Sequence, residues 1–259
     1  MAIQDIGETL ASAGETRIHL CGRFSVRING QRIDEGFPGR QGRLLFAYLA
    51  SRRSQSNTRT ELAKILWPEL VPDDPEIALA ALLAKLRKLV GKDLLLGKQD
   101  LHLALPDNSW VDIELAQTCL HRAESAISAR DWRGAWGPAQ VAVYISTRTF
   151  MAGFEHPWVQ GTRARLLDVQ MRANECMAAS GFNLGGAELL TAERAARRVL
   201  DLNPLRESAC KLLMQVLDAG GNRAEALQAY ERIRALMREQ LGVSPGPALQ
   251  AIHRQLLQQ

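Results

Sequence analysis

The sequence changes its pattern once along its length, near Pro106–Asp112. Before this point, short segments that alternate apolar and polar residues, as half-buried strands do, are mixed with short helical segments. After it, apolar residues recur at helical spacing, and turn residues separate segments that are long enough to be helices. The predicted fold class is therefore α+β followed by all-α, and the length of 259 residues agrees with two domains.

The first part of the chain is predicted to contain two β-hairpins. Residues 18–28 alternate as one half-buried strand, and Asn29-Gly30 is the strongest two-residue turn signal, so Gln31–Ile33 is expected to return as the second strand. The second hairpin is expected to pair Leu94–Leu96 with Leu101–Leu105 across a short polar turn. The segment between the two hairpins has a helical pattern instead.

Three helices are predicted between the hairpins, at residues 41–51, 61–66 and 75–90. Thr60 is expected to cap the second helix, and Trp67-Pro68 to end it. Pro75 suits the first position of the third helix, where its missing N–H costs nothing, and Gly91 is expected to stop that helix. The predicted order is a strand hairpin, three helices and a second strand hairpin.

The part after Asp112 is predicted to be helical throughout, at residues 113–130, 132–147, 157–180, 186–202, 205–219, 223–241 and 246–257. The breaks are expected at Arg130-Asp131, Gly153, Gly181, Asn203-Pro204, Gly220-Gly221 and Gly242–Pro245. Small residues recur where helices would cross, as in DWRGAWGPAQVAV and GNRAEALQAYERI, which open with a turn and continue with spaced alanines. A third segment, AERAARRVLDLNP, ends in the Leu-x-Leu-Asn-Pro that closes many tetratricopeptide units. Stacked helix pairs of a tetratricopeptide-like kind are expected.

Composition and motifs argue against an enzyme and against a membrane protein. The four cysteines are scattered without metal-ligand spacing, and none of the five histidines has a partner at ligand or triad spacing. GxxxxGK[ST], GxGxxG and HExxH motifs are absent, and no catalytic residue, cofactor or metal is predicted. The sequence has neither a signal-peptide pattern nor about 18 uninterrupted apolar residues, and we expect a soluble intracellular protein.

Two parts of the chain resemble one family. Residues 17–105 resemble the OmpR-like winged-helix DNA-binding domain of bacterial transcriptional activators of the antibiotic regulatory protein type, in the segments RIHLCGRFSVRINGQRI, GRQGRLLFAYLASRRSQSNTRTELAKILWPE and KLRKLVG. Residues 112–257 resemble the bacterial transcriptional activator domain that follows it in this family, above all in NPLRESACKLLMQVLDAGGNRAEALQAYERIRALMREQLGVSPGPALQAIHRQLL. The resemblance implies a winged helix-turn-helix domain with flanking hairpins and then a tetratricopeptide-like domain.

The resemblance also implies domain limits and a function. It implies an N-terminal extension at 1–16, which we expect to be flexible, a winged-helix domain at 17–108 and an activator domain at 109–259. Such a protein binds double-stranded DNA at promoter repeats in the bacterial cytoplasm, as a homodimer, and helps to recruit RNA polymerase. In this family the helical domain supports oligomerisation and polymerase contact. A nucleotide-triphosphatase module often follows, but this sequence ends at Gln259, so no ATP chemistry is expected.

The third helix of the winged domain is the one that the resemblance places in the major groove. At about 100° per residue, its leucines and Val90 gather on a core face, and the opposite face holds Ile77 with the base-reading candidates Ala81, Ala84, Lys85, Arg87 and Lys88. Bidentate base reading needs Arg, Lys, Asn or Gln, so Arg87 and Lys88 supply one or two such contacts at most, and the alanines reach only thymine methyls. The polar side chains with which this family reads bases are therefore mostly missing from the third helix.

Backbone binding has broader support in the sequence than base reading. Between Gly36 and Thr60 there is no acidic residue, and the candidates for phosphate contact in and near this stretch are Arg40, Arg43, Arg52, Arg53, Arg59, Thr60 and the wing-tip Lys98. A pI near 9.0 leaves room for an anionic partner, although the net charge is only +4. The alternative to base reading for Lys85, Arg87 and Lys88 is that they form a solvated helix end, where cations interact favourably with the C-terminal dipole.

The second part of the chain offers fewer candidates. Arg194, Arg197 and Arg198 form either a solvated face or a patch for a partner or a small anionic effector. The aromatic residues are expected to be packing residues, namely Trp132, Trp136, Tyr144, Phe150, Phe154, Trp158 and Tyr230. Two functions of different class follow: a DNA-binding transcriptional regulator, or a degenerate winged-helix module with helical repeats that binds a protein or an anionic effector and does not read DNA.

Overall fold

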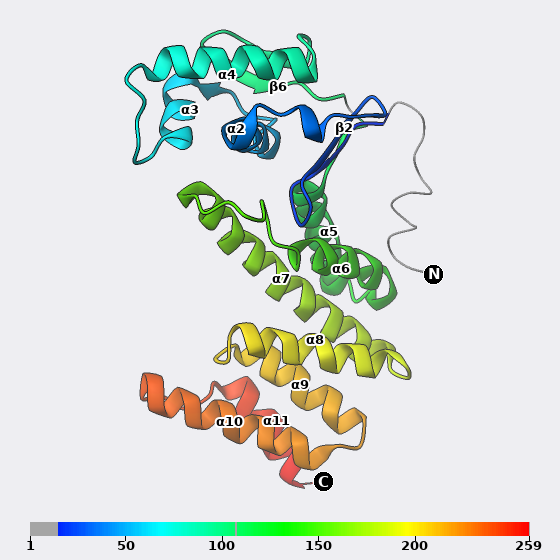
Figure 1. The fold of residues 1–259 in the computed structure, drawn as a ribbon. Helices are drawn as coiled ribbons and strands as arrows, with labels where there is room; N and C mark the ends of the chain where they lie inside the picture. Colours follow the sequence, from blue (N-terminus) through cyan, green and yellow to red (C-terminus); the bar gives the residue numbers. More distant parts are fainter. Residues whose placement is uncertain (1–14, 107, 259) are drawn as a thin grey trace. The chain divides into compact units, whose positions relative to one another are not determined.

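The computed structural model describes residues 15–106 and 108–258 (Figure 1). The chain forms two compact units. Unit 1 is the chain up to Leu115 together with Arg148–Arg163, and unit 2 is Ala116–Thr147 together with Ala164–Gln259. All the strands described lie in unit 1, and unit 2 is helical, so the α+β and all-α order is confirmed.

A four-stranded sheet lies at the start of unit 1. Its order is β3-β2-β1-β7, with β1 (Arg17–His19), β2 (Ser25–Ile28), β3 (Gln31–Arg32) and β7 (Trp110–Val111). β1 pairs antiparallel with β2 and parallel with β7. Ile18, Val26 and Val111 lie in one cross-strand row, and all three are buried, so this row anchors the sheet on the core of unit 1.

Residues 18–28 are not the single strand that their alternation predicts, because a turn divides them into β1 and β2. Gly22 turns the chain with a φ of +80°. The carboxylate of Asp112 accepts hydrogen bonds from the backbone N–H groups of Leu20 and Cys21, at 2.8 and 2.7 Å. Both arms of this hairpin direct alternate side chains to the same buried face, so the alternation continues through the turn and hides it.

The three predicted helices and the second hairpin are present (Figure 1). The helices are α2 (Gly39–Ser51), α3 (Arg59–Leu66) and α4 (Pro75–Val90), preceded by a short 3-10 helix, η1 (Asp34–Gly36). The wing sheet has the order β4-β6-β5 and consists of β4 (Asn57–Thr58), β6 (Asp100–Leu103) and β5 (Leu95–Leu96). The sequence did not reveal β4 or β7, each only a pair of residues long. Two successive helices followed by this hairpin form the expected winged helix-turn-helix.

α3 begins earlier than predicted, because Thr58 and not Thr60 is its N-cap. The Thr58 hydroxyl accepts a hydrogen bond from the Glu61 backbone N–H at 3.2 Å, and the Glu61 carboxylate accepts one from the Thr58 N–H at 3.0 Å. This capping box satisfies two donors that would otherwise stay unpaired at the helix end. Thr58 also ends β4, so strand and helix meet at one residue, and Thr60 lies exposed in the first turn.

α4 begins and ends as predicted. The Asp74 side chain accepts a hydrogen bond from the Ile77 backbone N–H at 2.9 Å, and Pro75 takes the first helical position. Gly91 ends the helix with a φ of +106°, which favours glycine. The predicted core face is confirmed: Leu79, Leu83, Leu86 and Val90 are buried, and Leu82 and Leu89 are half-buried.

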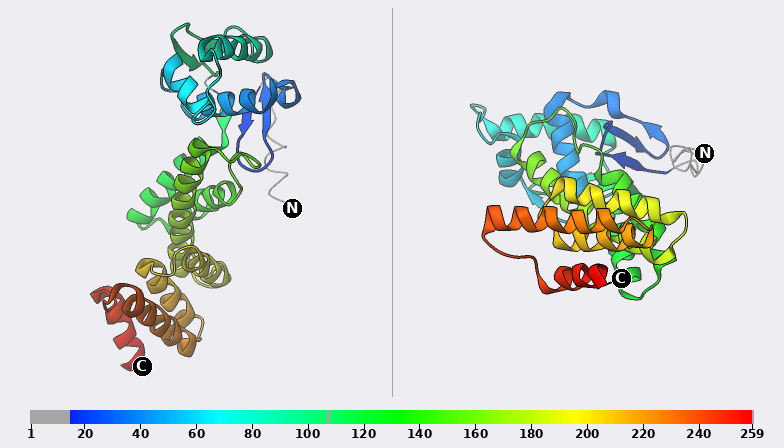
Figure 2. Two further views of the ribbon diagram at one scale, coloured as in Figure 1. Left: turned by 60° about the vertical axis from the view of Figure 1, so that its left-hand side comes forward. Right: turned by 90° about the horizontal axis from the view of Figure 1, so that it is seen from below.

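The remaining helices agree with the sequence to within a few residues. They are α5 (Asp112–Ser128), α6 (Trp132–Ser146), α7 (Pro157–Leu184), α8 (Glu188–Leu202), α9 (Glu207–Ala219), α10 (Arg223–Leu241) and α11 (Pro247–Gln258). In unit 2, α8, α9 and α10 lie side by side, each running opposite to the one before (Figures 1 and 2). The spaced alanines of α6, α8 and α10 are buried, as expected for tetratricopeptide-like packing: Ala135, Ala139, Ala142, Ala192, Ala195, Ala196, Ala226 and Ala229.

The break predicted at Gly181 is wrong, because α7 continues through it to Leu184. A Cβ atom at Gly181 would lie 2.9 Å from Cβ of Ala192 and 2.9 Å from Cζ3 of Trp136. The glycine therefore serves close packing between helices and not a turn. α7 ends at Gly185-Gly186 instead, where both residues have a positive φ.

The expected N-terminal extension, 1–16, mostly lies outside the described residues, since these begin at Glu15. Thr16 is buried, and its carbonyl accepts a hydrogen bond from the Trp110 N–H at 2.9 Å. The Thr16 hydroxyl accepts another from the Asn29 N–H at 3.2 Å. Thr16 is therefore bonded to β7 and to the β2–β3 turn just before β1 begins, and the domain limits drawn from the sequence stay predictions.

Candidate nucleic-acid interface

The exposed face of α4 carries one large apolar side chain, alanines and lysines. Ile77, in the first turn, is 68% exposed. The other exposed residues of this face are Ala80, Ala81, Ala84, Lys85 and Lys88. A stripe from Ile77 to Lys88 is about 16 Å long at ~1.5 Å per residue. It matches the face that the sequence places opposite the leucines, and its only hydrogen-bond donors are lysine ammonium groups.

Three lysines on α4 and the wing have side chains that are available to a ligand. Lys85 and Lys88 lie in the last turns of α4, and Lys98 lies in the turn between β5 and β6. All three are exposed, and none makes a hydrogen bond or ion pair within the part of the chain that the structure describes. An ammonium group is a compact charge with three donors, which suits contact with a phosphate oxygen.

Arg87 is directed to the wing and not to the exposed stripe. Its Nε donates a hydrogen bond to the Leu95 carbonyl at 3.2 Å, and its Nη2 donates one to the Gly97 carbonyl at 2.5 Å. The residue is half-buried. Base reading by Arg87 stays a prediction, but two nitrogens of its guanidinium are already engaged. A helical projection could not show this, because the acceptors belong to the hairpin that follows the helix.

Two of the arginines predicted to contact phosphate form ion pairs. Arg53 donates from Nε to both carboxylate oxygens of Glu114, at 2.9 and 3.0 Å. Arg59 donates from Nε to the Glu76 carboxylate at 2.7 Å and from Nη2 to the Glu76 carbonyl at 3.3 Å. The Arg59 side chain is only 18% exposed, so it joins the start of α3 to the start of α4.

The other three arginines predicted to contact phosphate lie over aromatic rings. The rings beneath Arg40, Arg43 and Arg52 belong to Phe154, Phe24 and Tyr48, with Cζ to centroid distances of 4.4, 5.7 and 5.4 Å. Arg40 also donates a hydrogen bond to the Gly153 carbonyl at 2.7 Å. Such cation–π contacts contribute about 0.5–1 kcal/mol at exposed sites. Each of the five arginines thus has a structural partner, and their contact with phosphate stays a prediction.

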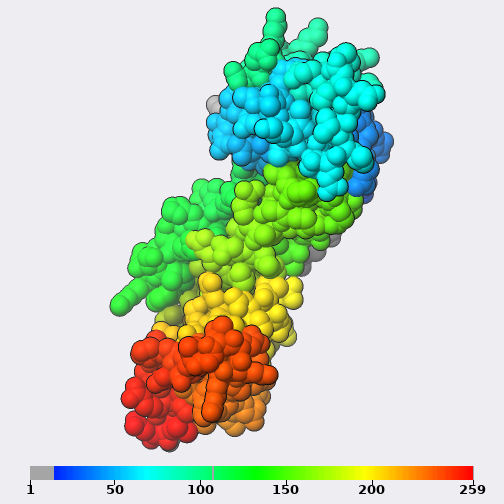
Figure 3. Space-filling model, turned by 90° about the vertical axis from the view of Figure 1, so that its left-hand side faces the viewer, coloured from blue at the N-terminus to red at the C-terminus, as the bar shows by residue number. Residues whose placement is uncertain are grey.

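The loop between α3 and α4 exposes a second apolar surface. Leu70 is 88% exposed and Val71 is 63% exposed. Three acidic residues flank them, namely Glu69, Asp73 and Asp74. Figure 3 shows the cyan region of the chain, which contains this loop, at the molecular surface. Exposed leucine and valine amid acids mark the loop as a candidate for contact with a protein.

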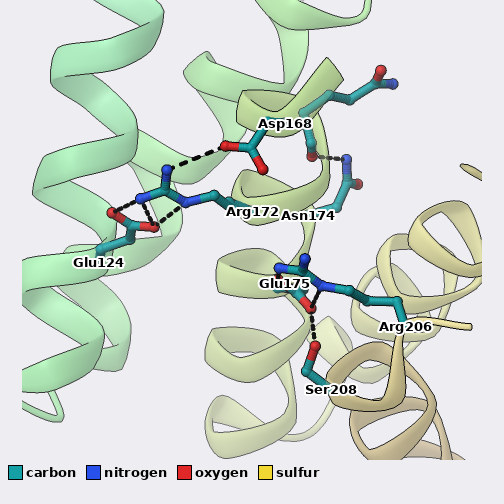
Figure 4. Close-up of polar contacts among 8 residues, drawn as sticks. Glu124, Asp168, Arg172, Asn174, Glu175, Arg206 and Ser208 are labelled. Atoms are coloured by element: carbon teal, nitrogen blue, oxygen red, sulfur yellow. Dashed lines mark hydrogen bonds and ion pairs between the residues drawn. The ribbon is translucent and has the colours of Figure 1, made fainter. Parts of the chain in front are cut away.

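Charged residues of unit 2 pair across its helices (Figure 4). Arg172 of α7 donates to both carboxylate oxygens of Glu124 on α5, at 2.8 Å each, and to Asp168 at 3.3 Å. Arg206, just before α9, donates to both oxygens of Glu175 on α7, at 3.0 and 2.8 Å. These bidentate pairs join neighbouring helices and fix their order, so the charges shown there serve the fold.

The arginine patch predicted on α8 is partly engaged. Arg197 forms ion pairs with Glu193 at 2.7 Å and with Glu225 of α10 at 2.8 Å. Arg194 and Arg198 are exposed. A role of this patch in binding an effector or partner stays a prediction.

The aromatic residues of the second part are packing residues in the structure. Phe150, Phe154 and Tyr230 are buried, and the remaining ones are half-buried, namely Trp132, Trp136, Tyr144 and Trp158. Trp158 lies edge-on to Tyr48 and to Phe150, with ring centroids 5.1 and 5.5 Å apart. These contacts agree with the packing role that the sequence suggests.

Burial changes the pKa of several titratable groups. Burial raises the pKa of Asp112 to about 6, although the backbone N–H groups of Cys21, Leu20 and Ile113 oppose the shift. Burial also raises the pKa values of the Cys176 and Cys210 thiols to about 12. Among the described residues, no group of three His, Cys, Asp or Glu could hold a metal ion. No described helix has the length and apolar character required to cross a membrane.

The fold and this surface define a class of protein: a winged helix-turn-helix regulator with a helical-repeat domain. Residues 111–257 match the family described as bacterial transcriptional activator domain, and the chain belongs to that family. Together with its OmpR-like N-terminal region, it is a member of the antibiotic regulatory protein type. The resemblance seen in the sequence is thereby confirmed.

Relatives are found among regulators of actinobacteria. The chain is 30% identical to regulatory protein AfsR of Streptomyces coelicolor over 95% of its own length and 24% of that protein. It is 24% identical to the transcriptional regulatory protein EmbR of Mycobacterium tuberculosis over 93% of its length and 63% of EmbR. The structure of Mycobacterium tuberculosis EmbR in complex with a low-affinity phosphopeptide has the same fold, with a TM-score of 0.81 at 20% identity, covering 94% of this chain and 65% of that one. The chain thus spans about a quarter of AfsR, and both relatives are named as regulatory proteins.

Proposed function

We propose that the protein is a transcriptional activator that binds promoter DNA through α4 and the wing and helps to recruit RNA polymerase. The observation that carries the proposal is that Lys85, Lys88 and Lys98 are exposed and make no hydrogen bond or ion pair within the described residues. They lie on the helix and the hairpin that a winged helix-turn-helix presents to a duplex. Such a function places the protein in the bacterial cytoplasm, beside the chromosome.

The proposed contacts divide into backbone contacts and base contacts. Lysines at the end of α4 and at the wing tip supply phosphate contacts, which hold the protein on any duplex. The apolar stripe that starts at Ile77 lies in the major groove, where Ala81 and Ala84 approach thymine methyl groups. Because the lysines contact phosphates, this face has few donors left for direct hydrogen bonds to bases. We therefore expect modest intrinsic specificity, raised when two subunits bind repeated half-sites about one helical turn apart.

The test of DNA binding uses duplexes recovered from a random 30-base-pair pool. Fluorescence anisotropy should show tight binding by the wild type at low salt and about tenfold or greater loss when Lys85→Ala and Lys88→Ala are combined. The control combines Arg23→Ala and Arg27→Ala, which removes the same charge from exposed positions at the N-terminal sheet of unit 1. Equal losses of duplex affinity in both double variants would show that binding depends on net charge and not on the position of the lysines. Absence of duplex binding at low salt would favour the effector-binding module instead.

Recruitment of polymerase is supported by the exposed loop between α3 and α4. A partner that meets Leu70 and Val71 there must lie beside the DNA-facing helix, because the loop leads directly into α4. A polymerase bound at the same promoter is such a partner. Leu70→Ser with Val71→Ser should leave duplex affinity unchanged and abolish activation in a reconstituted transcription assay. Unchanged activation by this variant would show that the loop does not contact the polymerase.

A further inference from the structure

We propose that Arg87 is a positioning residue that fixes the wing, and with it Lys98, against α4. Helix and wing then meet a duplex as one rigid body. This inference rests on the proposed function for its effect on DNA, but the contact between Arg87 and the wing can be tested without DNA. It assigns Arg87 a task different from the base reading that the sequence predicts.

Arg87 acts as a strut, that is, a side chain whose two hydrogen bonds connect the end of α4 to the wing. The residue lies in the last turn of α4, and its guanidinium reaches the carbonyl of Leu95 on β5 and the carbonyl of Gly97 in the wing turn. Hydrogen bonds from a charged donor are roughly twice as strong as neutral ones. A planar guanidinium that donates from two nitrogens also fixes direction, which a lysine at the same position cannot do.

The tip of the wing is held from two sides. On the β6 side, the Gln99 carbonyl accepts a hydrogen bond from the Arg59 backbone N–H at 3.2 Å, and Asp100 pairs with Thr58 of β4. On the β5 side, the carbonyls of Leu95 and Gly97 accept hydrogen bonds from Arg87. β5 pairs with β6 through only two residue pairs, Leu95 with Leu103 and Leu96 with His102. The turn is tight: Gly97 has a φ of +89°, and a Cβ atom there would lie 1.8 Å from the Asp100 carbonyl oxygen. β5 is an edge strand of the wing sheet, whose order is β4-β6-β5, so β4 supports β6 and not β5. The two bonds from Arg87 therefore hold the β5 side of the turn, which the pairing of β6 with β4 does not reach.

The position of Lys98 depends on this strut, because Lys98 follows Gly97 directly in the turn. If the turn were free, its ordering on a duplex would cost conformational entropy at the moment of binding. With Arg87 in place that ordering has already occurred. Arg87 thus acts on DNA through Lys98, and loss of either residue should remove the same phosphate contact.

The first test needs no DNA. Hydrogen exchange of the backbone amides in residues 95–103 should become about tenfold faster in Arg87→Lys, which keeps the charge but not the planar fork. The matched control is Lys85→Arg, at an exposed site near the same helix end, and its wing amides should exchange as in the wild type. Wild-type exchange in Arg87→Lys would overturn the strut, whether or not the protein binds DNA.

The second test is a double-mutant cycle on a duplex recovered from the random pool. One phosphate contact contributes about 0.9 to the slope of log affinity against log salt, which amounts to about eightfold between 0.1 M and 1 M. Arg87→Lys and Lys98→Ala should each lose about eightfold at 0.1 M, and the double variant should lose no more. A loss of about sixtyfold in the double variant would show that Arg87 contacts DNA independently, and would overturn the proposal.

The two tests separate failure of the inference from failure of the function. If Arg87→Lys changes which base is preferred at any position of the duplex, Arg87 is a base reader and the strut assignment is wrong. If the wild type binds no duplex while its wing amides are protected as expected, the strut stands and the DNA-binding proposal falls. If Arg87→Lys binds DNA as the wild type does at every salt concentration, the coupling to Lys98 is refuted.

Discussion

The apolar stripe on α4 makes a specific prediction about base recognition. Ile77 is 68% exposed in the first turn of the helix, and a branched aliphatic side chain in the major groove finds its matching surface in the C5-methyl of thymine. Deoxyuridine presents the same hydrogen-bonding groups without that methyl. Because removing one buried methyl or methylene costs about 0.8 kcal/mol, each contacted thymine replaced by deoxyuridine should weaken binding about fourfold.

The assay compares matched duplexes by fluorescence anisotropy. A sequence recovered from the random pool is synthesised with each thymine replaced in turn by deoxyuridine, and the affinity ratio of the two forms is measured at every position. In the wild type, one or more positions should show a ratio near four, and Ile77→Ala should bring the ratio at one of them close to one. Lys88→Ala should weaken both forms alike and leave the ratio unchanged.

The control for the loss of an exposed aliphatic side chain is Leu190→Ala, since Leu190 is 55% exposed on α8 in unit 2. It should leave every ratio unchanged. Ile77→Ala removes no backbone hydrogen bond, because only the Ile77 N–H meets the Asp74 cap, and alanine favours a helix. A ratio near one at every thymine in the wild type would refute the reasoning, and so would a ratio that Ile77→Ala leaves intact.

Two further predictions concern the fold. Asp112 has its pKa raised to about 6 by burial, so the folded state binds its proton more tightly than the unfolded state. The contribution of Asp112 to the free energy of unfolding should therefore fall as pH rises from about 4 to about 6, while His19, whose pKa burial lowers to about 4, changes the free energy in the opposite direction. The free energy of unfolding of the wild type minus that of Asp112→Asn, measured by chemical denaturation, should therefore fall across this range. Gly181→Ala places a Cβ atom 2.9 Å from both Ala192 and Trp136, and overpacking of this kind costs about 1–3 kcal/mol. The matched control, Gly137→Ala, meets nothing within 4 Å, and thermal unfolding should show a lower midpoint for the first variant only.

The helices could be predicted closely because their ends carry local signals. Pro75 and Gly91 bound α4 by backbone conformation alone, and the sequence contains both. The turn inside residues 18–28 could not be predicted, because the alternation is the same on both sides of it. Gly181 shows the same limit: a glycine can mark a turn or a close helix crossing, and only the neighbours across the crossing decide which.

The exposed stripe of α4 could also be predicted, because helical geometry fixes which residues lie opposite the leucines. The partners of the arginines could not be predicted from the sequence. Glu114 follows Arg53 by 61 residues, and Gly153 follows Arg40 by 113. The stretch between Gly36 and Thr60 is rich in arginine and free of acid in the sequence, but acids, carbonyls and rings of unit 1, most of them outside the stretch, engage each of these arginines. A charge excess along the sequence is therefore weak evidence for a charged surface.

The salt dependence of duplex binding tests the central claim most directly, namely that lysines of α4 and the wing bind DNA while the arginines support the fold. Each phosphate contact contributes about −0.9 to the slope of log affinity against log salt, so Lys85, Lys88 and Lys98 together predict a slope of about −2.7 per protomer. Participation of the five arginines as well would raise this to about −7. A slope near −2.7 that disappears when the three lysines are replaced by alanine supports the account. A slope near −7, or one that survives those replacements, contradicts it.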